Sequence, residues 1–399
     1  MMQPGSLGAR AGGIVAAALV ASACADYERM AREHIEKEGC GDVVLTKGTD
    51  RGEFTFEAKC KGEICRGTVR VKGSAQASSF FLTKTCGPDE SKCGPGNGQV
   101  CFDVGLKYDR AGPEHDAAKA VAFYQKACDA GHADGCHNLA VSFDKGEGTP
   151  ADPAKATAAW AKACEAKRAA SCLLAGNRHA AGRGVPKAPA KAVAFFRRGC
   201  EAGDIGCCNN VGVALWYGQG VPKQRAEAVG FFDRACKAGD RDACGNVGVA
   251  YTDGEGVAKD VPRGVALLRE QCDKGHGRSC RNLGRMLRDA EGVPRDLPGA
   301  VALLQKACDA KDGPGCNSLG LMYEQGQGLP RDPAKAIATF QRGCDVGEQG
   351  DSELACLNLA RRLRDGKGVP RDAERAKGIF DRICAGGLEI ACKERQQMR

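Results

Sequence analysis

Residues 208–236 read CNNVGVALWYGQGVPKQRAEAVGFFDRAC, and residues 316–344 read CNSLGLMYEQGQGLPRDPAKAIATFQRGC. Both segments begin and end with cysteine, carry a glycine four residues after the first cysteine, and contain Gly-x-Gly near the middle. The segment from Cys244 to Cys272 follows the same pattern. Because one pattern recurs along the chain, the sequence predicts a repeat array rather than independent domains.

Two series of cysteines set the length of the repeat. Each series advances by 36 residues, one through 128, 164, 200, 236, 272, 308 and 344 and the other through 136, 172, 208, 244, 280 and 316. An insertion of four residues near Gln349 shifts the later members to 356, 384 and 392, and Cys93 and Cys101 begin the pattern one residue out of phase. Periods of about 20–50 residues are typical of solenoid proteins.

Each unit predicts a helix, a loop and a second helix. Apolar or small residues occur three, four and seven residues after the first cysteine, as at Val211, Gly212 and Leu215, and this is the spacing of one helix face. The Gly-x-Gly then ends the helix, because glycine accepts the left-handed conformation found at helix C-termini. The second helix often follows an aspartate N-cap, and the candidates are Asp152, Asp260, Asp296, Asp332 and Asp372.

Eight such units begin at Cys101, Cys136, Cys172, Cys208, Cys244, Cys280, Cys316 and Cys356. Their Val/Leu-Gly pair, G-x-G-V-P loop, D-x-x-K-A start and final Ala-Cys resemble the Sel1-like repeat, a relative of the tetratricopeptide repeat. The cysteine placement resembles the Helicobacter cysteine-rich family of Sel1-like proteins. The resemblance implies an all-α fold, namely a right-handed α/α solenoid stapled by disulfides.

The cysteine spacing predicts disulfides between neighbouring units. The pairs are C-x7-C, or C-x11-C where the insertion near Gln349 falls, from the end of one second helix to the start of the next first helix. A tight turn there brings the Cα atoms to the separation of about 5.5 Å that a disulfide needs. Zinc sites favour C-x2-C pairs or nearby histidines, and the six histidines have no regular spacing. We therefore predict no metal, no cofactor and nine disulfides: Cys93–Cys101, Cys128–Cys136, Cys164–Cys172, Cys200–Cys208, Cys236–Cys244, Cys272–Cys280, Cys308–Cys316, Cys344–Cys356 and Cys384–Cys392.

Residues 24–92 interrupt the repeat and predict a small α+β module, which either caps the solenoid or binds something separately. The charged stretch 26–39 indicates a helix, and apolar residues that alternate with polar ones at 53–58 and 69–72 indicate strands, with a third at 80–82. Its four cysteines allow three connectivities, of which we choose Cys40–Cys86 with Cys60–Cys65. Cys207 is left over as a free thiol or an intermolecular link.

The first 23 residues read MMQPGSLGARAGGIVAAALVASA and predict a signal peptide. Arg10 gives a basic start, the apolar run 14–20 is too short to anchor in a bilayer, and residues 21–23 fit the small-residue cleavage rule. Cleavage leaves Cys24 first, which resembles the lipobox of bacterial lipoproteins, although Ala21 replaces a larger aliphatic residue. We predict export, either to the periplasm or outer membrane as a lipoprotein lipidated at Cys24, or by plain secretion.

Composition excludes several classes of protein. The chain has 24 cysteines among 399 residues, which favours an oxidising compartment over the cytosol. Its net charge of +8 is spread along the sequence, unlike the basic patch of a nucleic-acid-binding protein. We therefore predict no nucleic-acid partner, and membrane attachment only through a lipid anchor. The expected organisation is a signal peptide over 1–23, the module over 24–92, and a solenoid of eight units of about 36 residues over 93–399.

The resemblance to the Helicobacter cysteine-rich family implies penicillin binding with weak β-lactamase activity. A serine β-lactamase needs an S-x-x-K nucleophile motif together with S-D-N and K-T-G motifs. Residues Ser142 to Lys145 read S-F-D-K, but neither partner motif occurs in the sequence. The catalytic residues are therefore unknown, and a hydrolase is an alternative that rests on resemblance alone.

A binding surface is the function that the sequence favours. Stacked helix pairs form a superhelix whose first helices usually line the concave face. A row of asparagine side-chain amides on that face would hold an extended peptide or glycan backbone by hydrogen bonds. Alternatively, each asparagine caps or hydrogen-bonds the start of its own helix. Arginines on the same helices, Arg178, Arg281, Arg285, Arg361 and Arg362, either receive acidic groups or are solvated. We predict a scaffold that binds a peptide, a protein or cell-wall fragments through asparagines two residues after the first cysteine: Asn138, Asn210, Asn246, Asn282 and Asn358.

Overall fold

A computed structural model describes residues 28–47, 53–60, 63–74, 77–113, 115–346 and 352–398. The predicted signal peptide over 1–23 and the predicted lipidation at Cys24 lie outside the described residues. The chain divides into two compact units within one helix: the first runs to Arg178 and includes Arg183–Pro186, and the second holds His179–Gly182 and everything from Lys187 onward. Among the described residues, no helix combines the length and the hydropathy that a bilayer crossing requires.

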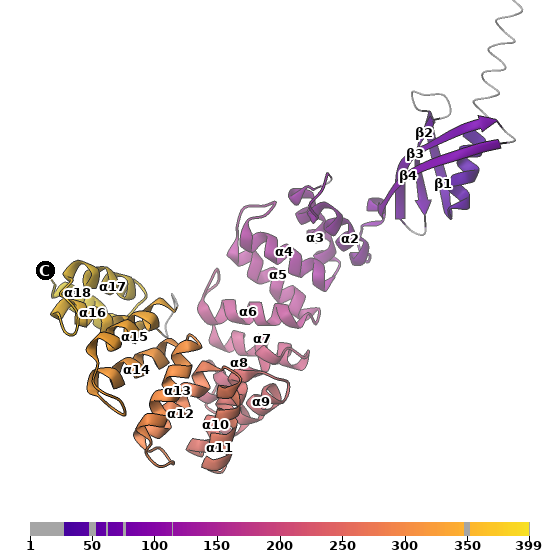
Figure 1. The fold of residues 1–399 in the computed structure, drawn as a ribbon. Coiled ribbons are helices and arrows are strands. Elements are labelled where there is room, and N and C mark those ends of the chain that lie inside the picture. Colours follow the sequence, from indigo (N-terminus) through magenta and orange to yellow (C-terminus); the bar gives the residue numbers. More distant parts are fainter. Residues whose placement is uncertain are drawn as a thin grey trace, which may run out of the picture. The chain divides into compact units, whose positions relative to one another are not determined.

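Eight repeats of two helices follow one another from residue 98 (Figure 1). The first helices are α2 (Gly98–Asp109), α4 (Ala133–Lys145), α6 (Ala169–Ala181), α8 (Ile205–Tyr217), α10 (Arg241–Asp253), α12 (Gly277–Asp289), α14 (Gly313–Gln325) and α16 (Glu353–Asp365). The second helices are α3 (Ala117–Asp129), α5 (Pro153–Glu165), α7 (Pro189–Glu201), α9 (Arg225–Lys237), α11 (Val261–Asp273), α13 (Leu297–Asp309), α15 (Pro333–Asp345) and α17 (Ala373–Ala385), and α18 (Glu389–Gln396) comes last. The predicted fold class, a helical solenoid behind a small sheet module, is confirmed.

The helix ends use the residues that the sequence offers for them. The side chain of Asp260 accepts a hydrogen bond from the backbone N–H of Arg263 and so satisfies one donor at the start of α11. The other four predicted aspartate N-caps make equivalent bonds. Gly254 ends α10 with a φ of 73°, in the left-handed region, whereas Ala290 takes that position after α12 with a φ of 58°. An alanine there carries strain that glycine avoids.

One large side chain fills the centre of each repeat. In five repeats it faces a glycine of the first helix, and a Cβ added at Gly212 would lie only 2.5 Å from the ring of Phe232. The glycine, which lacks a Cβ, makes room for this side chain. Burial of one such side chain stabilises the fold by about 1.5–3 kcal/mol. The large residue always precedes the last cysteine of its repeat by four positions and is at most 6% exposed: Tyr124, Trp160, Phe196, Phe232, Leu268, Leu304, Phe340 and Phe380.

Disulfides join each second helix to the helix that follows it, and one more joins Cys93 to α2. All nine predicted pairs of the repeat array are bonded, with Cα–Cα distances between 4.3 and 4.8 Å. On the chain-entropy account, closing a loop this short contributes about 2.5 kcal/mol. Cys207 is the free cysteine among the described residues and is fully buried in α8 beside the bonded Cys208. Burial and the carboxylate of Asp204 raise the pKa of its thiol, which disfavours the reactive thiolate form.

The N-terminal module is a helix over residues 28–37 packed against an antiparallel sheet. Its core contains Phe54, Phe56 and Val69 from the sheet, with Ala31 and Ile35 from the helix. The sheet adds one strand that the sequence reading missed, at 40–47, although its Val-Val-Leu-Thr run is typical of a strand. The strands lie in the order β1 (Cys40–Lys47), β2 (Glu53–Cys60), β3 (Glu63–Ser74) and β4 (Ala77–Pro88).

The predicted disulfide pairing in this module, Cys40–Cys86 with Cys60–Cys65, is wrong. Cys40 is bonded to Cys60. The reason is strand register, because the antiparallel β1–β2 pairing places these two residues opposite each other. Cys65 is also disulfide-bonded, and the β3–β4 register places it opposite Cys86. The spacing of the cysteines in the sequence does not determine this register, so it could not identify the correct pairs.

Candidate functional site

A cleft of about 480 Å³ opens on the first helices of the second unit. Helices α8, α10 and α12 supply most of its lining, and Phe232 of α9 and Pro314 of α14 complete it. The lining combines aromatic rings, asparagine amides and arginine guanidinium groups. None of the described residues that line it is acidic. The cleft therefore offers apolar contact, neutral hydrogen bonding and positive charge in one place.

The cleft brings together two of the five predicted asparagines. Asn246 of α10 and Asn282 of α12 both line it. Asn138, Asn210 and Asn358 occupy the matching positions of α4, α8 and α16 and are partly buried there. The predicted asparagines thus occupy matching positions in their own repeats, and the two on α10 and α12 share one cleft.

Two of the asparagines also connect neighbouring repeats. The amide of Asn246 donates to the side-chain oxygen of Asn209 at 3.2 Å, and that of Asn358 donates to Asn317 at 2.7 Å. Neither amide caps its own helix, since the N-cap of α10 is Asp240 and that of α16 is Ser352. For these two residues, the alternative that each asparagine satisfies its own helix start is wrong. The Asn246 carbonyl oxygen can still accept a hydrogen bond from a ligand.

Three arginines of α12 give the cleft its charge. Arg281 forms an ion pair with Asp312 at 2.8 Å, in a geometry that makes no hydrogen bond through its Nε. The Arg285 guanidinium lies 3.4 Å from Glu291, and its side chain is 52% exposed. Arg278, which is 43% exposed, also lines the cleft.

An acidic neighbour from α10 lies close to this charge. The Arg278 guanidinium is 3.8 Å from the carboxylate of Asp242. His276 Nε2 lies 3.2 Å from the same Asp242 oxygen. A hydrogen bond from His276 and the charge of Arg278 hold the pKa of Asp242 below its usual range, although burial opposes this shift. Asp242 is therefore the carboxylate with which a bound anion would compete for Arg278.

The other arginines that the sequence predicts to bind acidic groups form ion pairs with carboxylates of this chain. Arg178 is only 11% exposed and is paired with Asp144 at 2.6 Å. Arg362 makes two hydrogen bonds to the carboxylate of Glu324, at 3.0 and 2.6 Å. Arg361 contacts a carboxylate of α18 in the same way. These three side chains connect structural elements and do not line the cleft.

Aromatic side chains form the wall of the cleft on the α8 side. Tyr217 is 62% exposed, which is unusual for a ring of this size. Trp216 packs against Phe232 with a centroid distance of 6.0 Å, and the guanidinium of Arg225 lies 5.6 Å from the Trp216 ring. The Trp216 ring thus packs against neighbouring side chains, while the Tyr217 ring is largely exposed at the cleft.

A second pocket, of about 450 Å³, continues the cleft toward the hairpin loops of α10 and α12. It shares Asn282 and Arg285 with the cleft and adds Asp253, Lys259 and Glu291. Positive charge therefore dominates at the Arg278 end, and charges of both signs lie at the loop end. A ligand that extends along both pockets meets two different electrostatic environments.

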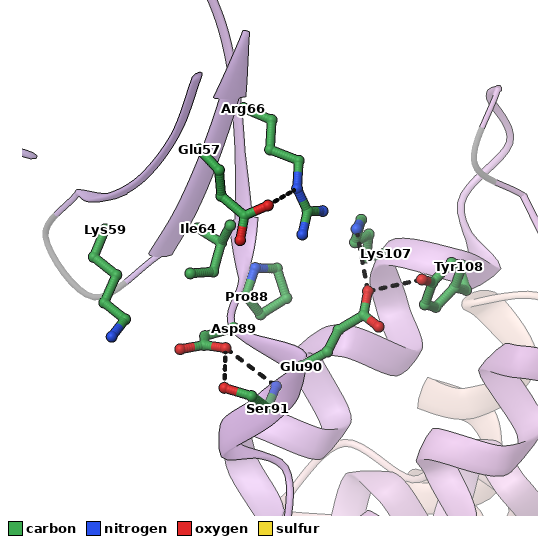
Figure 2. Close-up of a pocket in the computed structure, with 10 residues that line it drawn as sticks. All are labelled: Glu57, Lys59, Ile64, Arg66, Pro88, Asp89, Glu90, Ser91, Lys107 and Tyr108. Atoms are coloured by element: carbon green, nitrogen blue, oxygen red, sulfur yellow. Dashed lines mark hydrogen bonds and ion pairs between the residues drawn. The ribbon is translucent and has the colours of Figure 1, made fainter. Parts of the chain in front are cut away.

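A further pocket, of about 460 Å³, lies in the first unit between the sheet and α2, and Figure 2 shows its lining. Its charged groups neutralise one another. Arg66 is paired with Glu57 at 2.8 Å, and Glu90 accepts from Lys107 at 3.4 Å and from the Tyr108 hydroxyl at 2.7 Å (Figure 2). Unlike the cleft on α8, α10 and α12, this pocket has no dominant charge and no exposed aromatic wall.

The S-x-x-K segment does not form a catalytic pair. Ser142 is 8% exposed within α4, and its carbonyl oxygen accepts from the N–H of Gly146 at the helix end. Lys145 is exposed, with its ammonium group 3.6 Å from Glu147. An activated nucleophile needs a base within hydrogen-bond reach. Nothing in this geometry supports hydrolysis at Ser142.

The sequence reading missed Trp216, Tyr217 and Arg278. A usable signal for the charge was present, because Arg278, Arg281 and Arg285 are spaced by three and four residues and so share one helix face. No comparable signal marks Trp216 and Tyr217. Only the packing of α8 beside α10 shows that these rings border the cleft.

Comparison with known proteins gives the fold family. The Sel1 repeat profile matches residues 99–132, 133–167, 169–204, 206–240, 241–276, 277–312, 313–347 and 354–388. A search of curated proteins finds no match. Cysteine rich protein B of Helicobacter pylori is 30% identical over a match that covers 34% of this chain and 97% of that protein, with a TM-score of 0.27.

Two longer solved structures share the fold. A Sel1 repeat protein from Oxalobacter formigenes is 20% identical, with a TM-score of 0.57, and the match covers 76% of this chain and 87% of that protein. A protective antigen present in uropathogenic Escherichia coli strains is 22% identical, with a TM-score of 0.55, over 76% of this chain. The match spans 64% of the length of the E. coli protein.

Proposed function

This chain belongs to the Sel1 repeat family, and on that premise we propose that it is an exported scaffold that binds an extended peptide segment of a partner protein in the cleft of α8, α10 and α12. The Sel1 repeat fold is consistent with a protein-binding scaffold. The observation that carries the proposal is the meeting of two asparagine amides with exposed aromatic surface in one cleft of about 480 Å³.

The side chains of the cleft suit the chemistry of a peptide. An extended segment presents one N–H and one C=O per residue, and asparagine can both donate to and accept from these groups. Asn246 and Asn282 are placed for this role on adjacent first helices. The ring of Tyr217 offers apolar contact to a side chain of the segment, as aromatic residues often do at interfaces.

Extracytoplasmic placement follows from the disulfides. Bonds of this number persist in oxidising compartments and are rare in the cytosol. For the route, we propose cleavage of the signal peptide after Ala23, with lipidation at Cys24 as the expected anchor and plain secretion as the alternative. Metabolic labelling with a fatty acid, compared between the wild type and Cys24→Ala, distinguishes the two routes.

The test of the binding role is capture from an envelope extract with the oxidised protein as bait. Tyr217→Ala and Asn282→Ala should each lose the captured partner, because each removes a group that lines the cleft. Arg269→Ala is the matched control, since Arg269 is exposed on the second helix of the α10 repeat. Circular dichroism verifies that all three variants fold.

Retention of the same partner by both cleft variants would contradict the proposal. Loss of the partner in the Arg269→Ala control would place the binding surface on the second helices instead. Recovery of a glycan rather than a protein from the wild-type bait would replace the peptide with a cell-wall fragment as the ligand.

A further inference from the structure

Helix α12 carries a row of arginines that the other first helices lack. Arg278, Arg281 and Arg285 are separated by three and four residues, so they lie along one face of the helix. The matching positions in α10 are Asp242 and two neutral residues. At a rise of 1.5 Å per residue, the row is about 10 Å long.

The row is only partly neutralised within the protein. The carboxylates near it belong to Asp242, Asp312 and Glu291, and each of them approaches one arginine. None of the three lines the cleft. Of these contacts, the 3.8 Å approach to Arg278 is too long for a hydrogen bond.

Each guanidinium therefore keeps donors for a ligand. Arginine has five N–H groups in a planar fork that matches a carboxylate. Like charges three and four residues apart on a helix destabilise it by about 0.2–0.5 kcal/mol per pair. An anion in the cleft relieves this repulsion, so the row is better satisfied in the bound state than in the free protein.

The length of the row favours several carboxylates over one. An extended peptide advances about 3.3 Å per residue, so about 10 Å corresponds to three residues. A single chain-terminal carboxylate reaches one or two of the arginines. Acidic side chains within a segment reach all three, while the neighbouring rings of Trp216 and Tyr217 receive an apolar side chain.

From these observations we propose that the cleft selects acidic, extended peptide segments, and that Arg278, Arg281 and Arg285 bind two or more side-chain carboxylates within the segment. This inference rests on the proposed function and names the class of partner that the cleft accepts. Arg285 lies where the cleft meets the second pocket, and beyond it charges of both signs line the loop ends of the helices.

Fluorescence anisotropy with synthetic peptides tests the selectivity. The probes are three labelled 12-residue peptides, each amidated at the C-terminus and containing one phenylalanine, with Glu, Gln or Lys at alternating positions. With the full, oxidised protein, we expect the Glu peptide to bind about tenfold more tightly than the Gln peptide, the Lys peptide to bind most weakly, and added salt to reduce the difference.

Variants assign the effect to the arginines. The double variant Arg281→Gln/Arg285→Gln should weaken binding of the Glu peptide about tenfold and so remove most of the difference in affinity between the Glu and Gln peptides. Arg281→Lys/Arg285→Lys should keep most of the affinity, because it keeps the charge. Arg269→Gln, which removes an exposed arginine from α11, should change neither peptide.

The outcomes separate the inference from the proposed function. If the Glu and Gln peptides bind equally and Tyr217→Ala weakens both, the cleft binds peptides but does not select acidic ones. If a Gln peptide with a free C-terminus binds as tightly as the amidated Glu peptide, the arginines recognise a chain terminus, which overturns the inference. If no peptide binds, both proposals are contradicted.

Discussion

The α10–α11 and α12–α13 repeats are built alike inside and differently outside. Both first helices place a small residue against the large side chain of the second helix: Gly248 faces Leu268, and Gly284 faces Leu304. Both leucines are fully buried. The Cys272–Cys280 bridge joins the two repeats covalently. At these positions, packing and cross-linking leave little freedom to the sequence.

The exposed face of the same two helices follows no such constraint. Where α12 has Arg278 and Arg285, α10 has Asp242 and Val249. All four side chains lie at or beside the cleft. The buried positions of a repeat therefore specify the fold, while the exposed positions of individual repeats determine what the surface can bind. Substitutions of the two kinds should therefore have separable effects.

The largest effect is expected at the buried leucines. Leu268→Ala and Leu304→Ala should each lower the free energy of unfolding by about 2–5 kcal/mol, because each leaves a cavity where no side chain can collapse. Because the two leucines are packed alike, the two variants should lose similar amounts of stability. The loss is measured as the shift in the midpoint of urea unfolding. A loss below about 1 kcal/mol in one of them would show that the two repeats are not built alike inside.

A smaller and opposite pair of effects is expected at the helix ends. Gly254→Ala forces a side chain into the left-handed conformation and should destabilise by about 1 kcal/mol. Ala290→Gly removes the same strain after α12. The net gain in the free energy of unfolding should be about 0.5–1 kcal/mol, because the greater entropy of glycine in the unfolded chain offsets part of the relief. Thermal unfolding of both variants measures the difference, and effects of the same sign would refute the explanation by strain.

Most of the solenoid was predictable because its signals are local and recur. Glycine breaks and aspartate caps occur within single repeats, and each cysteine pair spans the short turn to the next helix. Each signal is therefore seen several times along the chain. The Cys40–Cys60 bond depends instead on the register of two strands that occur once, and the spacing of the four cysteines does not encode that register.

The candidate site was predictable only in part. The position of Asn246 and Asn282 two residues after a cysteine indicated a shared face, and the structure places both in one cleft. The exposed ring of Tyr217 and the ion pairs of the arginines depend on which side chains of neighbouring helices meet. Such contacts between repeats are not visible in the pattern that the repeats share.

The smallest effect is expected at the contact between the two compared helices. Asp242→Asn removes the α10 carboxylate that interacts with His276 and Arg278 of α12. Because Asp242 is about half exposed, its ion pairs should contribute less than about 1 kcal/mol at pH 7.

The folded-state pKa of Asp242 is lowered, so this contribution to stability is complete above the unfolded-state pKa of about 3.9 and disappears as the pH falls through the folded-state pKa. The unfolding free energies of the variant and the wild type, measured in urea, should therefore converge once the pH falls below the folded-state pKa of Asp242. The same substitution should tighten the acidic peptide, because it removes the competing carboxylate beside Arg278; weaker binding would mean that Asp242 positions Arg278 rather than competing for it.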